Sequence, residues 1–524
     1  MGRPLPSSRD RPQVTEPALE RSEAGRASAP SDGSTASSAL TIGSRAIANT
    51  FFRSGGELVG RLASLVLFAV TARHVGQDGL GAFVFAIAYL GFVMVVVDLG
   101  LDRFMLLAIA RDRPAGDRLF FNFLSLKVAV AVPLLGASFL ALPLLGYSYV
   151  FQATTWALAP GVFFDSVARL QLAVFMGHER GGPPSFADMI QRILSAALGI
   201  AALEAGYGVI AVAIAYSVGS AIGVLIGFVL LARTVGMPAR AVEPRRWRGL
   251  AVESLPFASQ DVFTVMLARL DTLILSLLAA EAVVGRYGAA YRLFESSFLL
   301  VYALGGSFSA MYAYLGHDTT PSLRFMFQRS IKLAIVLLTP VAVLVGVLAE
   351  PICRLIYGAA FASAAAPLRI LAPAIVLLGV VSLATSLMLS RDNPRRMVSL
   401  TAAIVFVNVA LNLILIPLYS DTGAAVAMLA SEALFAAWTM RWAYRAVRGV
   451  EWLPMLAGTL AAGACMVLTT LLLHGSPVLA AVGGLLVYAL ALFAVERLVS
   501  PRDVELLGRM LRTRLTRVRQ PDAS

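Results

Sequence analysis

The chain has 524 residues, of which 58% are hydrophobic and 14% are charged. Soluble globular domains average roughly 25% charged residues, so this composition excludes an ordinary soluble fold. The formal net charge is +12, and in a membrane protein such an excess belongs to loops that meet anionic lipid, so it does not indicate a nucleic-acid surface.

Residues 1–46 are rich in Ser, Pro, Ala and charged side chains and contain no apolar core. This composition predicts a disordered cytoplasmic tail and shows no cleavable signal peptide.

Between residues 47 and 500 the chain is almost entirely apolar, broken by short polar gaps. A membrane span needs roughly 20 apolar residues, and about fourteen such stretches fit. The expected spans are 47–72, 80–107, 119–145, 149–177, 184–203, 207–232, 252–279, 283–315, 324–349, 364–390, 397–418, 423–444, 452–474 and 477–499. The sequence therefore predicts an all-α integral membrane protein without a separate soluble domain.

Lys and Arg crowd into every second gap between these stretches. Because cytoplasmic loops retain basic residues, the alternation predicts an even number of spans with both termini in the cytoplasm.

The first twelve spans divide into two similar sets of six. Gly81 matches Gly285, and Pro133 matches Pro340, at nearly constant offsets. The pattern predicts an N-lobe (47–233) and a C-lobe (252–446) that are related by a pseudo-two-fold axis along the membrane normal, as in many transporters. A chance match of small residues is the alternative. A cytoplasmic inter-lobe loop (234–251) separates the lobes, and two further helices (447–500) follow them.

Ionisable residues recur inside the first eight spans, where each charge costs at least about 2.5–3.5 kcal/mol at the bilayer centre. The basic ones are Arg53, Arg61, Arg103, Lys127, Arg169, Arg192, Arg269 and Arg292, and the acidic ones are Glu57, Asp98, Asp102, Asp165, Asp188, Asp261, Asp271 and Glu295. We therefore expect most of them to face each other or water.

Spacing divides these charges into two groups. Asp165 and Arg169, and Asp188 and Arg192, are four residues apart, so they are expected to form structural or gate ion pairs on one helix face. Arg269 and Asp271 point to opposite sides of their helix, so each needs a partner elsewhere. In the functional interpretation, residues of spans 1, 7 and 8 line a hydrated cleft and bind substrate: Arg53, Glu57, Arg61, Arg269, Asp271, Arg292 and Glu295. In the alternative they are structural pairs.

Arginine suits a phosphate site because its planar fork of donors grips two oxygens at once and stays charged when partly desolvated. The later spans carry little charge. Asn408 and Asn412 are expected to form interhelical hydrogen bonds, and Glu432 stands alone.

Four stretches resemble the polysaccharide and O-antigen flippases of the multidrug/oligosaccharidyl-lipid/polysaccharide exporter superfamily. They are Asn412–Pro417 with Gly423–Ala427, Ser431 and Glu432; Ala72–Gly76 with Gly81–Phe83 and Asp98–Gly100; Arg269–Thr272 with Gly285–Leu293; and Ile356–Gly358 with Ala366–Leu371. Their order and spacing cover residues 47–450.

The resemblance implies a MATE-like fold and a non-enzymatic flippase of the bacterial inner membrane that serves surface polysaccharide, lipopolysaccharide or exopolysaccharide synthesis. Its cargo would be an oligosaccharide on undecaprenyl diphosphate, moved by alternating access, with Arg61, Arg269 and Arg292 holding the diphosphate. Polysaccharide polymerases and glycosyltransferases are the partners it suggests. Coupling to H⁺ or Na⁺ through Glu57 or Asp271 stays open.

Three other functions were weighed. A multidrug or cation exporter on the same fold is the main alternative. A membrane glycosyltransferase or polymerase would need a larger outward loop with acids or histidines, and an inactive scaffold is the third. The two cysteines and four histidines lie apart in sequence and predict no metal site or other cofactor.

The basic C-terminal segment 501–524 places Val504, Leu507 and Leu511 along one helical face, with arginines between them. It predicts an amphipathic helix on the inner leaflet, with a charged, disordered end as the alternative.

Overall fold

The computed structural model describes residues 33–499 except 239–241, 316–320, 392–393 and 448–451. The chain divides into two units, Met1–Phe51 and Phe52–Ser524. Both expected tails fall largely outside the described residues. Helix α1 begins at Gly33, so residues 33–46 are helical and the tail expected over 1–46 is too long at that end; the Ala- and Ser-rich stretch continues the helical run of the first span.

The structure of the described residues is built from helices. The first set comprises α1 (Gly33–Asp98), α2 (Leu101–Arg111), α3 (Arg113–Asp117), α4 (Phe120–Leu144), α5 (Tyr149–Gly177), α6 (Gly182–Glu204) and α7 (Val209–Thr234). Helix α1 is two helices joined at Gly76, whose φ of 68° lies in the left-handed region that glycine adopts without strain. The first two expected spans therefore both lie within α1, one on each side of Gly76.

The second set begins with α8 (Pro244–Leu278), α9 (Glu281–Ser296), α10 (Phe298–Leu315), α11 (Pro321–Val347) and α12 (Ala349–Tyr357). It continues with the 3₁₀ helix η1 (Ala359–Ala364), α13 (Ala365–Leu371), α14 (Ala374–Arg391), α15 (Pro394–Ala446), α16 (Trp452–Leu472) and α17 (Pro477–Val499). Helix α15 is also two helices, joined at Ser420.

Among the described residues, ten helical stretches are long and apolar enough to cross a membrane, by length and composition. The predicted fold class, an all-helical integral membrane protein, is confirmed. The number of passes and the two-fold relation between lobes stay predictions.

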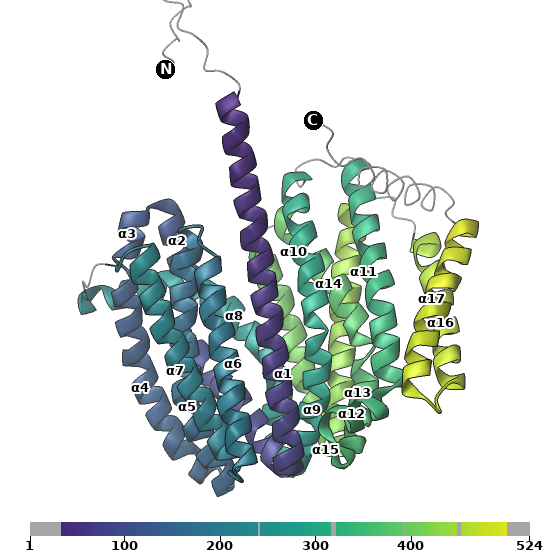
Figure 1. Ribbon diagram of the computed structural model, residues 1–524, viewed down its shortest axis with the longest axis horizontal. Coiled ribbons are helices and arrows are strands. Elements are labelled where there is room, and N and C mark those ends of the chain that lie inside the picture. Colours follow the sequence, from purple (N-terminus) through teal and green to yellow (C-terminus); the bar gives the residue numbers. More distant parts are fainter. Residues whose placement is uncertain (1–32, 239–241, 316–320, 392–393, 448–451, 500–524) are drawn as a thin grey trace, which may run out of the picture. The chain divides into compact units, whose positions relative to one another are not determined.

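Within the unit that starts at Phe52, the helices form two groups. Helices α2, α4, α5, α6 and α7 pack on one another, and α9 to α15 form the second group. Figure 1 shows α4 to α7 on one side, α10, α11 and α14 on the other, and α16 with α17 at the far edge. Helices α16 and α17 pack on each other and on α11, where Lys332 Nζ lies 2.6 Å from Glu496 Oε2.

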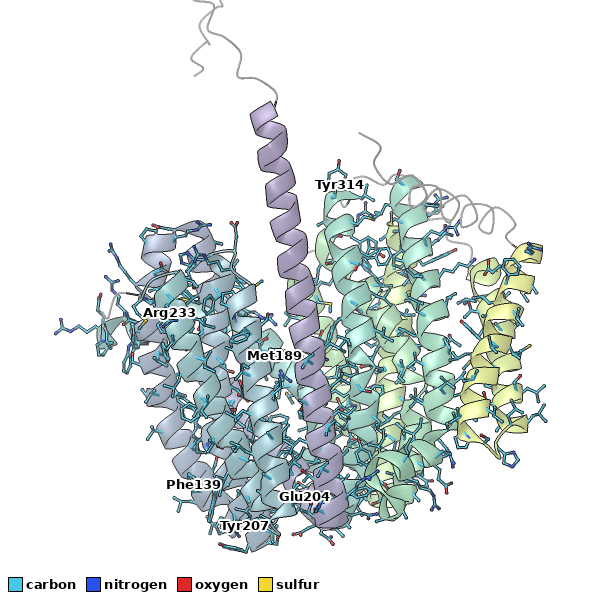
Figure 2. All side chains as sticks on the ribbon, viewed as in Figure 1. Phe139, Met189, Glu204, Tyr207, Arg233 and Tyr314 are labelled. Atoms are coloured by element: carbon cyan, nitrogen blue, oxygen red, sulfur yellow. The ribbon has the colours of Figure 1, made fainter. Side chains whose placement is uncertain are left out.

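The turns lie at two opposite ends of this unit. We call the end that carries Gly76 the Gly76 end, and the end that carries Asn122 the Asn122 end. Figure 2 shows Glu204 and Tyr207 at one end and Arg233 toward the other. Glu204 Oε1 lies 3.5 Å from Nε2 of His74, two residues before Gly76, so the former is the Gly76 end. The basic-loop pattern predicts that the Asn122 end faces the cytoplasm.

Helix α8 corrects the expected inter-lobe loop 234–251, because it begins at Pro244. Proline at the first helical position is favoured, since its missing N–H would be unpaired there in any case. Leu250 is buried and Trp247 is partly buried in an N-lobe cluster with Phe104 and Phe228, and the Glu243 N–H donates to Asn122 Oδ1 at 2.7 Å. The first turns of α8 are therefore anchored to the N-lobe.

The expected span 80–107 is broken at Leu99 and Gly100, whose φ values are 47° and 70°. Leu99 is a bulky residue in the left-handed region, so the break carries local strain. A Cβ on Gly100 would overlap the backbone of α8 at Ala258, so this glycine lets the two helices approach closely.

Candidate functional site

Two arginines from neighbouring helices share one carboxylate. Arg269 Nη2 on α8 lies 3.2 Å from Glu295 Oε1, and Arg292 Nη1 on α9 lies 3.0 Å from Glu295 Oε2. All three side chains are only about a quarter exposed, at 27%, 28% and 25%. Arg61 on α1 stands three residues before Ser64, which Arg292 contacts, so Arg61 and Ser64 share one face of α1. We call Arg61, Arg269, Arg292 and Glu295 the arginine cluster.

Helix α1 positions one member of this cluster. Arg292 Nη2 donates to Ser64 Oγ at 2.6 Å, and its guanidinium lies 5.6 Å from the ring centroid of Phe68. Ser64 and Phe68 are four residues apart, so they share one face of α1. The Arg269 guanidinium lies 5.8 Å from the Tyr291 ring. Stacking on aromatic faces stabilises partly desolvated guanidinium groups, so these rings and Ser64 fix the direction of the donors.

Asp271 lies apart from these contacts, as the sequence predicted from its spacing. It is 1% exposed, accepts from the Thr272 N–H at 2.7 Å, and accepts from the Tyr287 hydroxyl of α9. Its partners are neutral donors, so the structure places it in the packing between α8 and α9. The side chains of Arg53 and Glu57, also predicted to bind substrate, lie outside the described residues.

A second group of charges fills the N-lobe around the helix break. Lys127 Nζ lies 2.9 Å from Asp98 Oδ1 and 2.7 Å from Asp102 Oδ1, and the lysine side chain is fully buried. It also contacts both the Ser166 carbonyl and hydroxyl at 3.1 Å. Arg169 Nη2 lies 2.5 Å from Asp98 Oδ2. These contacts join α1, α2, α4 and α5.

The sequence predicted an ion pair between Asp165 and Arg169, and the structure corrects this prediction. Arg169 turns to Asp98, whereas Asp165 accepts from Gln191 at 2.6 Å and from the Tyr216 hydroxyl at 2.6 Å. Four-residue spacing permits a pair on one helix, but here each side chain contacts partners on neighbouring helices instead. Arg192 and Asp188 do lie together, with Nε and Oδ2 2.9 Å apart.

A further ion pair joins the two lobes. Arg103 Nη2 on α2 lies 2.7 Å from Asp261 Oδ1 on α8. Each residue was noted in the sequence as a charge within a span, but nothing in the spacing identified them as partners, because they come from different helices.

Contacts between the lobes also close around Gly76. Arg73 Nε donates to the Ile356 carbonyl at 2.9 Å, and Gln77 Nε2 donates to the Ala360 carbonyl at 2.5 Å. The hydroxyls of Tyr147 and Ser276 lie 3.0 Å apart, beside a small cavity of about 270 Å³. These polar contacts hold the Gly76 end of the bundle together.

Arg286 and Asp421 form a bidentate pair that the sequence did not reveal. Arg286 Nε lies 2.5 Å from Asp421 Oδ2, and Nη2 lies 2.9 Å from Oδ1. Asp421 falls between two expected spans, and an acidic residue in a polar turn between spans gives no reason to expect a functional or structural role. The only available signal was an arginine on the otherwise sparsely basic outer side.

In the C-lobe the expected interhelical bond of Asn408 is present, because its Nδ2 donates to Ser431 Oγ at 3.1 Å. Asn412 donates to Asn408. Glu432 is 2% exposed, and among the described residues its Oε2 has no hydrogen-bond partner.

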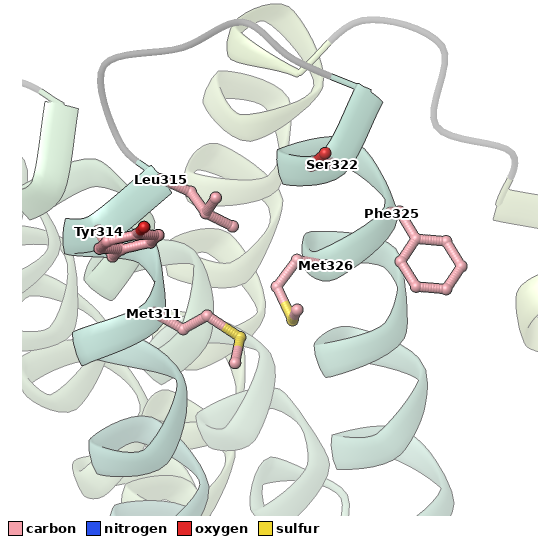
Figure 3. A pocket seen from close by; sticks show the side chains of 6 residues that line it. All are labelled: Met311, Tyr314, Leu315, Ser322, Phe325 and Met326. Carbon is pink, nitrogen blue, oxygen red and sulfur yellow. The ribbon is translucent and has the colours of Figure 1, made fainter.

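A larger pocket of about 590 Å³ opens between the end of α10 and the start of α11. Figure 3 shows its lining from the two helices: Met311, Tyr314, Leu315, Ser322, Phe325 and Met326. The described residues that line it are uncharged and include no member of the arginine cluster, so this lining offers a diphosphate no counter-charge.

The long apolar helices indicate a multi-pass membrane protein, and their fold is that of solved flippases and multidrug transporters. Two solved structures match this fold. Lipid II flippase MurJ in an inward closed conformation matches with a TM-score of 0.71 at 15% identity, over 87% of this chain and 99% of that chain. An inward-facing multidrug resistance MATE family transporter matches with a TM-score of 0.64 at 15% identity, over 74% of this chain and 94% of that chain.

The sequence comparisons indicate which kind of membrane protein the chain resembles. The family described as polysaccharide biosynthesis protein matches residues 46–304. A probable low-salt glycan biosynthesis flippase, Agl15, of Haloferax volcanii is 22% identical over 375 residues, 71% of this chain and 78% of its own length. The predicted resemblance to polysaccharide flippases is therefore confirmed. These relatives are flippases and transporters rather than enzymes.

Proposed function

We propose that this protein flips lipid-linked oligosaccharides, and that its cargo is an oligosaccharide on undecaprenyl diphosphate destined for a bacterial surface polysaccharide. The observation that carries the proposal is the arginine cluster, in which guanidinium groups of α8 and α9 divide one carboxylate between them. Two positive groups against one negative group leave an excess of positive charge at this point. A diphosphate diester, with one negative charge on each phosphate, is complementary to that excess.

The position of the cluster supports a role in translocation. Arg292 belongs to the C-lobe set and bonds to Ser64 of α1, so a headgroup held there would contact both helix groups at once. Alternating access moves one lobe against the other around such a midway site. The sugar hydroxyls and phosphates would follow the polar path between lobes, whereas the polyprenyl chain would stay in lipid.

The cluster disfavours the main alternative, a multidrug exporter of cations. A cationic drug would need a net acidic cleft, and here the acid is outnumbered by arginines. Chemically, the same site would repel a cation and attract a phosphate.

The test replaces each of Arg61, Arg269 and Arg292 with alanine. We expect each change to weaken binding of undecaprenyl diphosphate to the purified protein by roughly 10- to 100-fold, because a hydrogen bond to a charged group contributes about 1.5–3 kcal/mol. Export of surface polysaccharide in cells that depend on the gene should fall in parallel.

Arg354→Ala is the matched control. Arg354 lies on α12, is 53% exposed and pairs with Glu350 rather than with Glu295. Its loss should leave binding and export near the unaltered level. Full binding and export in all three cluster variants would refute the proposed site.

A further inference from the structure

Glu295 has a place in the arginine cluster that differs from that of a substrate ligand. Its two carboxylate oxygens are divided between two arginines, Oε1 toward Arg269 and Oε2 toward Arg292. This is how the two oxygens of a phosphate would be divided between the same donors. A carboxylate cannot attract a diphosphate directly, because like charges at short range repel.

We propose that Glu295 is an internal stand-in for the substrate phosphate, which pairs with Arg269 and Arg292 until the diphosphate displaces it. The inference rests on the proposed function and describes how that site is regulated. While it bridges the two arginines, the carboxylate neutralises guanidinium groups that lie partly desolvated on α8 and α9.

Burial explains why such a stand-in is needed. The Arg269, Arg292 and Glu295 side chains are about three-quarters buried, and an arginine without a counter-charge in that setting is costly. Glu295 lies one helical turn from Arg292 on α9, so it reaches that arginine in any position of the lobes. Arg269 comes from α8 and Ser64 from α1, so the rest of the arrangement depends on how the helices meet.

Charge repulsion explains why the stand-in also aids release. The carboxylate lies within 3.2 Å of both arginines, so it stands close to the phosphates that those arginines bind and repels them. Without the carboxylate this repulsion is absent, and the site holds its cargo more firmly. Glu295 therefore lowers the affinity for the cargo and raises the rate at which the cargo is released.

The test uses Glu295→Gln in the full-length protein in lipid nanodiscs, with undecaprenyl diphosphate as the probe. Glutamine keeps the size of the side chain and removes its charge. We expect binding to tighten by about tenfold, while export of surface polysaccharide falls because the cargo leaves slowly. Glu295→Asp retracts the carboxylate by one methylene group and keeps its charge, so it should bind between the two and restore most of the export.

The matched control is Glu350→Gln. Glu350 also stands between two arginines, with Arg354 at 2.9 Å and Arg369 at 3.7 Å, but it is exposed and lies on α12. Its replacement should change neither binding nor export. An infrared difference spectrum supplies a readout that a structural role would not move. Adding the probe should shift a carboxylate band in the unaltered protein and in Glu350→Gln, and that shift should be missing in Glu295→Gln.

Unchanged or weaker binding in Glu295→Gln would overturn the inference, and weaker binding would identify Glu295 as a substrate ligand or a positioning residue for the arginines. If Glu295→Gln does not accumulate in the membrane, Glu295→Asp carries the same comparison. Failure of the proposed function looks different, because then the unaltered protein would not bind the probe, or the arginine variants would bind it as well as the unaltered protein does.

Discussion

Gly81 of α1 and Gly285 of α9 pack against each other where the two helices come closest. A Cβ on Gly81 would overlap the carbonyl oxygen of Glu281, and a Cβ on Gly285 would overlap the carbonyl oxygen of Gln77. Gln77 stands four residues before Gly81, and Glu281 stands four residues before Gly285. The contacts are thus reciprocal, as in an interface around a two-fold axis. The sequence had matched these two glycines as equivalent positions of a repeat, and here the equivalent positions touch.

Alanine at Gly81 or Gly285 is therefore expected to push α1 and α9 apart at the Gly76 end. Each variant should lower export several-fold and raise the labelling rate of a cysteine placed at Val284, which is fully buried. The labelling is measured in a background without Cys353 and Cys465, the free cysteines of the described chain.

Gly91→Ala is the control for that experiment. Gly91 also lies on α1, and a Cβ there would meet nothing within 4 Å. It should label and export like the unaltered protein. Equal labelling in the Gly81, Gly285 and Gly91 variants would show that the glycine contact does not set the helix separation.

The pair of Arg103 and Asp261 is expected to respond to charge reversal. Arg103→Asp alone places two acids together at the contact between α2 and α8. Like charges placed together cost several kcal/mol, so export should fall by at least about tenfold, which corresponds to about 1.4 kcal/mol. The double variant Arg103→Asp with Asp261→Arg should recover most of the loss.

Arg113 and Glu179 supply the comparison, because they lie 3.2 Å apart but are 54% and 85% exposed. Exposed pairs contribute little, so the same reversals there should leave export unchanged. If the double reversal of Arg103 and Asp261 is no better than the single one, the pair does not act through its charge.

Lys127→Met is expected to destabilise the N-lobe strongly. The lysine is fully buried between Asp98 and Asp102, and removing one partner of a buried ion pair leaves an uncompensated charge at a cost of about 3–5 kcal/mol. Thermal unfolding of the purified protein measures the loss. Combining Lys127→Met with Asp102→Asn should recover part of it, because one acid then loses its charge together with the lysine. A fully stable single variant would contradict the account.

Hydrophobic runs and basic gaps were sufficient to predict the helical membrane fold, because span length and loop charge are local properties of the sequence. Helix α5 follows the expected span closely, Tyr149–Gly177 against 149–177. The start of α8 at Pro244 was missed, since the arginines that follow it suggest a loop. Only the docking of Trp247 and Leu250 on the N-lobe explains the helix there.

The candidate site was predictable in its residues more than in its partners. Arg292 and Glu295 are three residues apart, a spacing that allows the pair seen on one helix, and spacing excluded Asp271 as a partner of Arg269. Spacing failed for Asp165 and Arg169, because the choice of partner depends on which helices become neighbours. Arg286 with Asp421 was missed for the same reason, since that pair joins segments far apart in the sequence.

Arg286→Lys is expected to weaken the contact between α9 and the bend in α15. The arginine makes two bonds to Asp421, at 2.5 and 2.9 Å, and the carboxylate is 6% exposed. Lysine supplies one point charge in place of a planar fork, so the second bond is lost at a cost of about 1–2 kcal/mol. The bend itself is strained, because Ser420 has a φ of 57°, so a weaker contact should let it open. Thermal unfolding should report the lower stability, and limited proteolysis near Thr422 should report the opening. Arg354→Lys is the comparison. Arg354 also makes two hydrogen bonds, to Glu350, but that pair is exposed and contributes roughly 0–1 kcal/mol to stability. If both lysine variants unfold at the same temperature as the unaltered protein, the bidentate geometry of Arg286 contributes nothing to holding the bend.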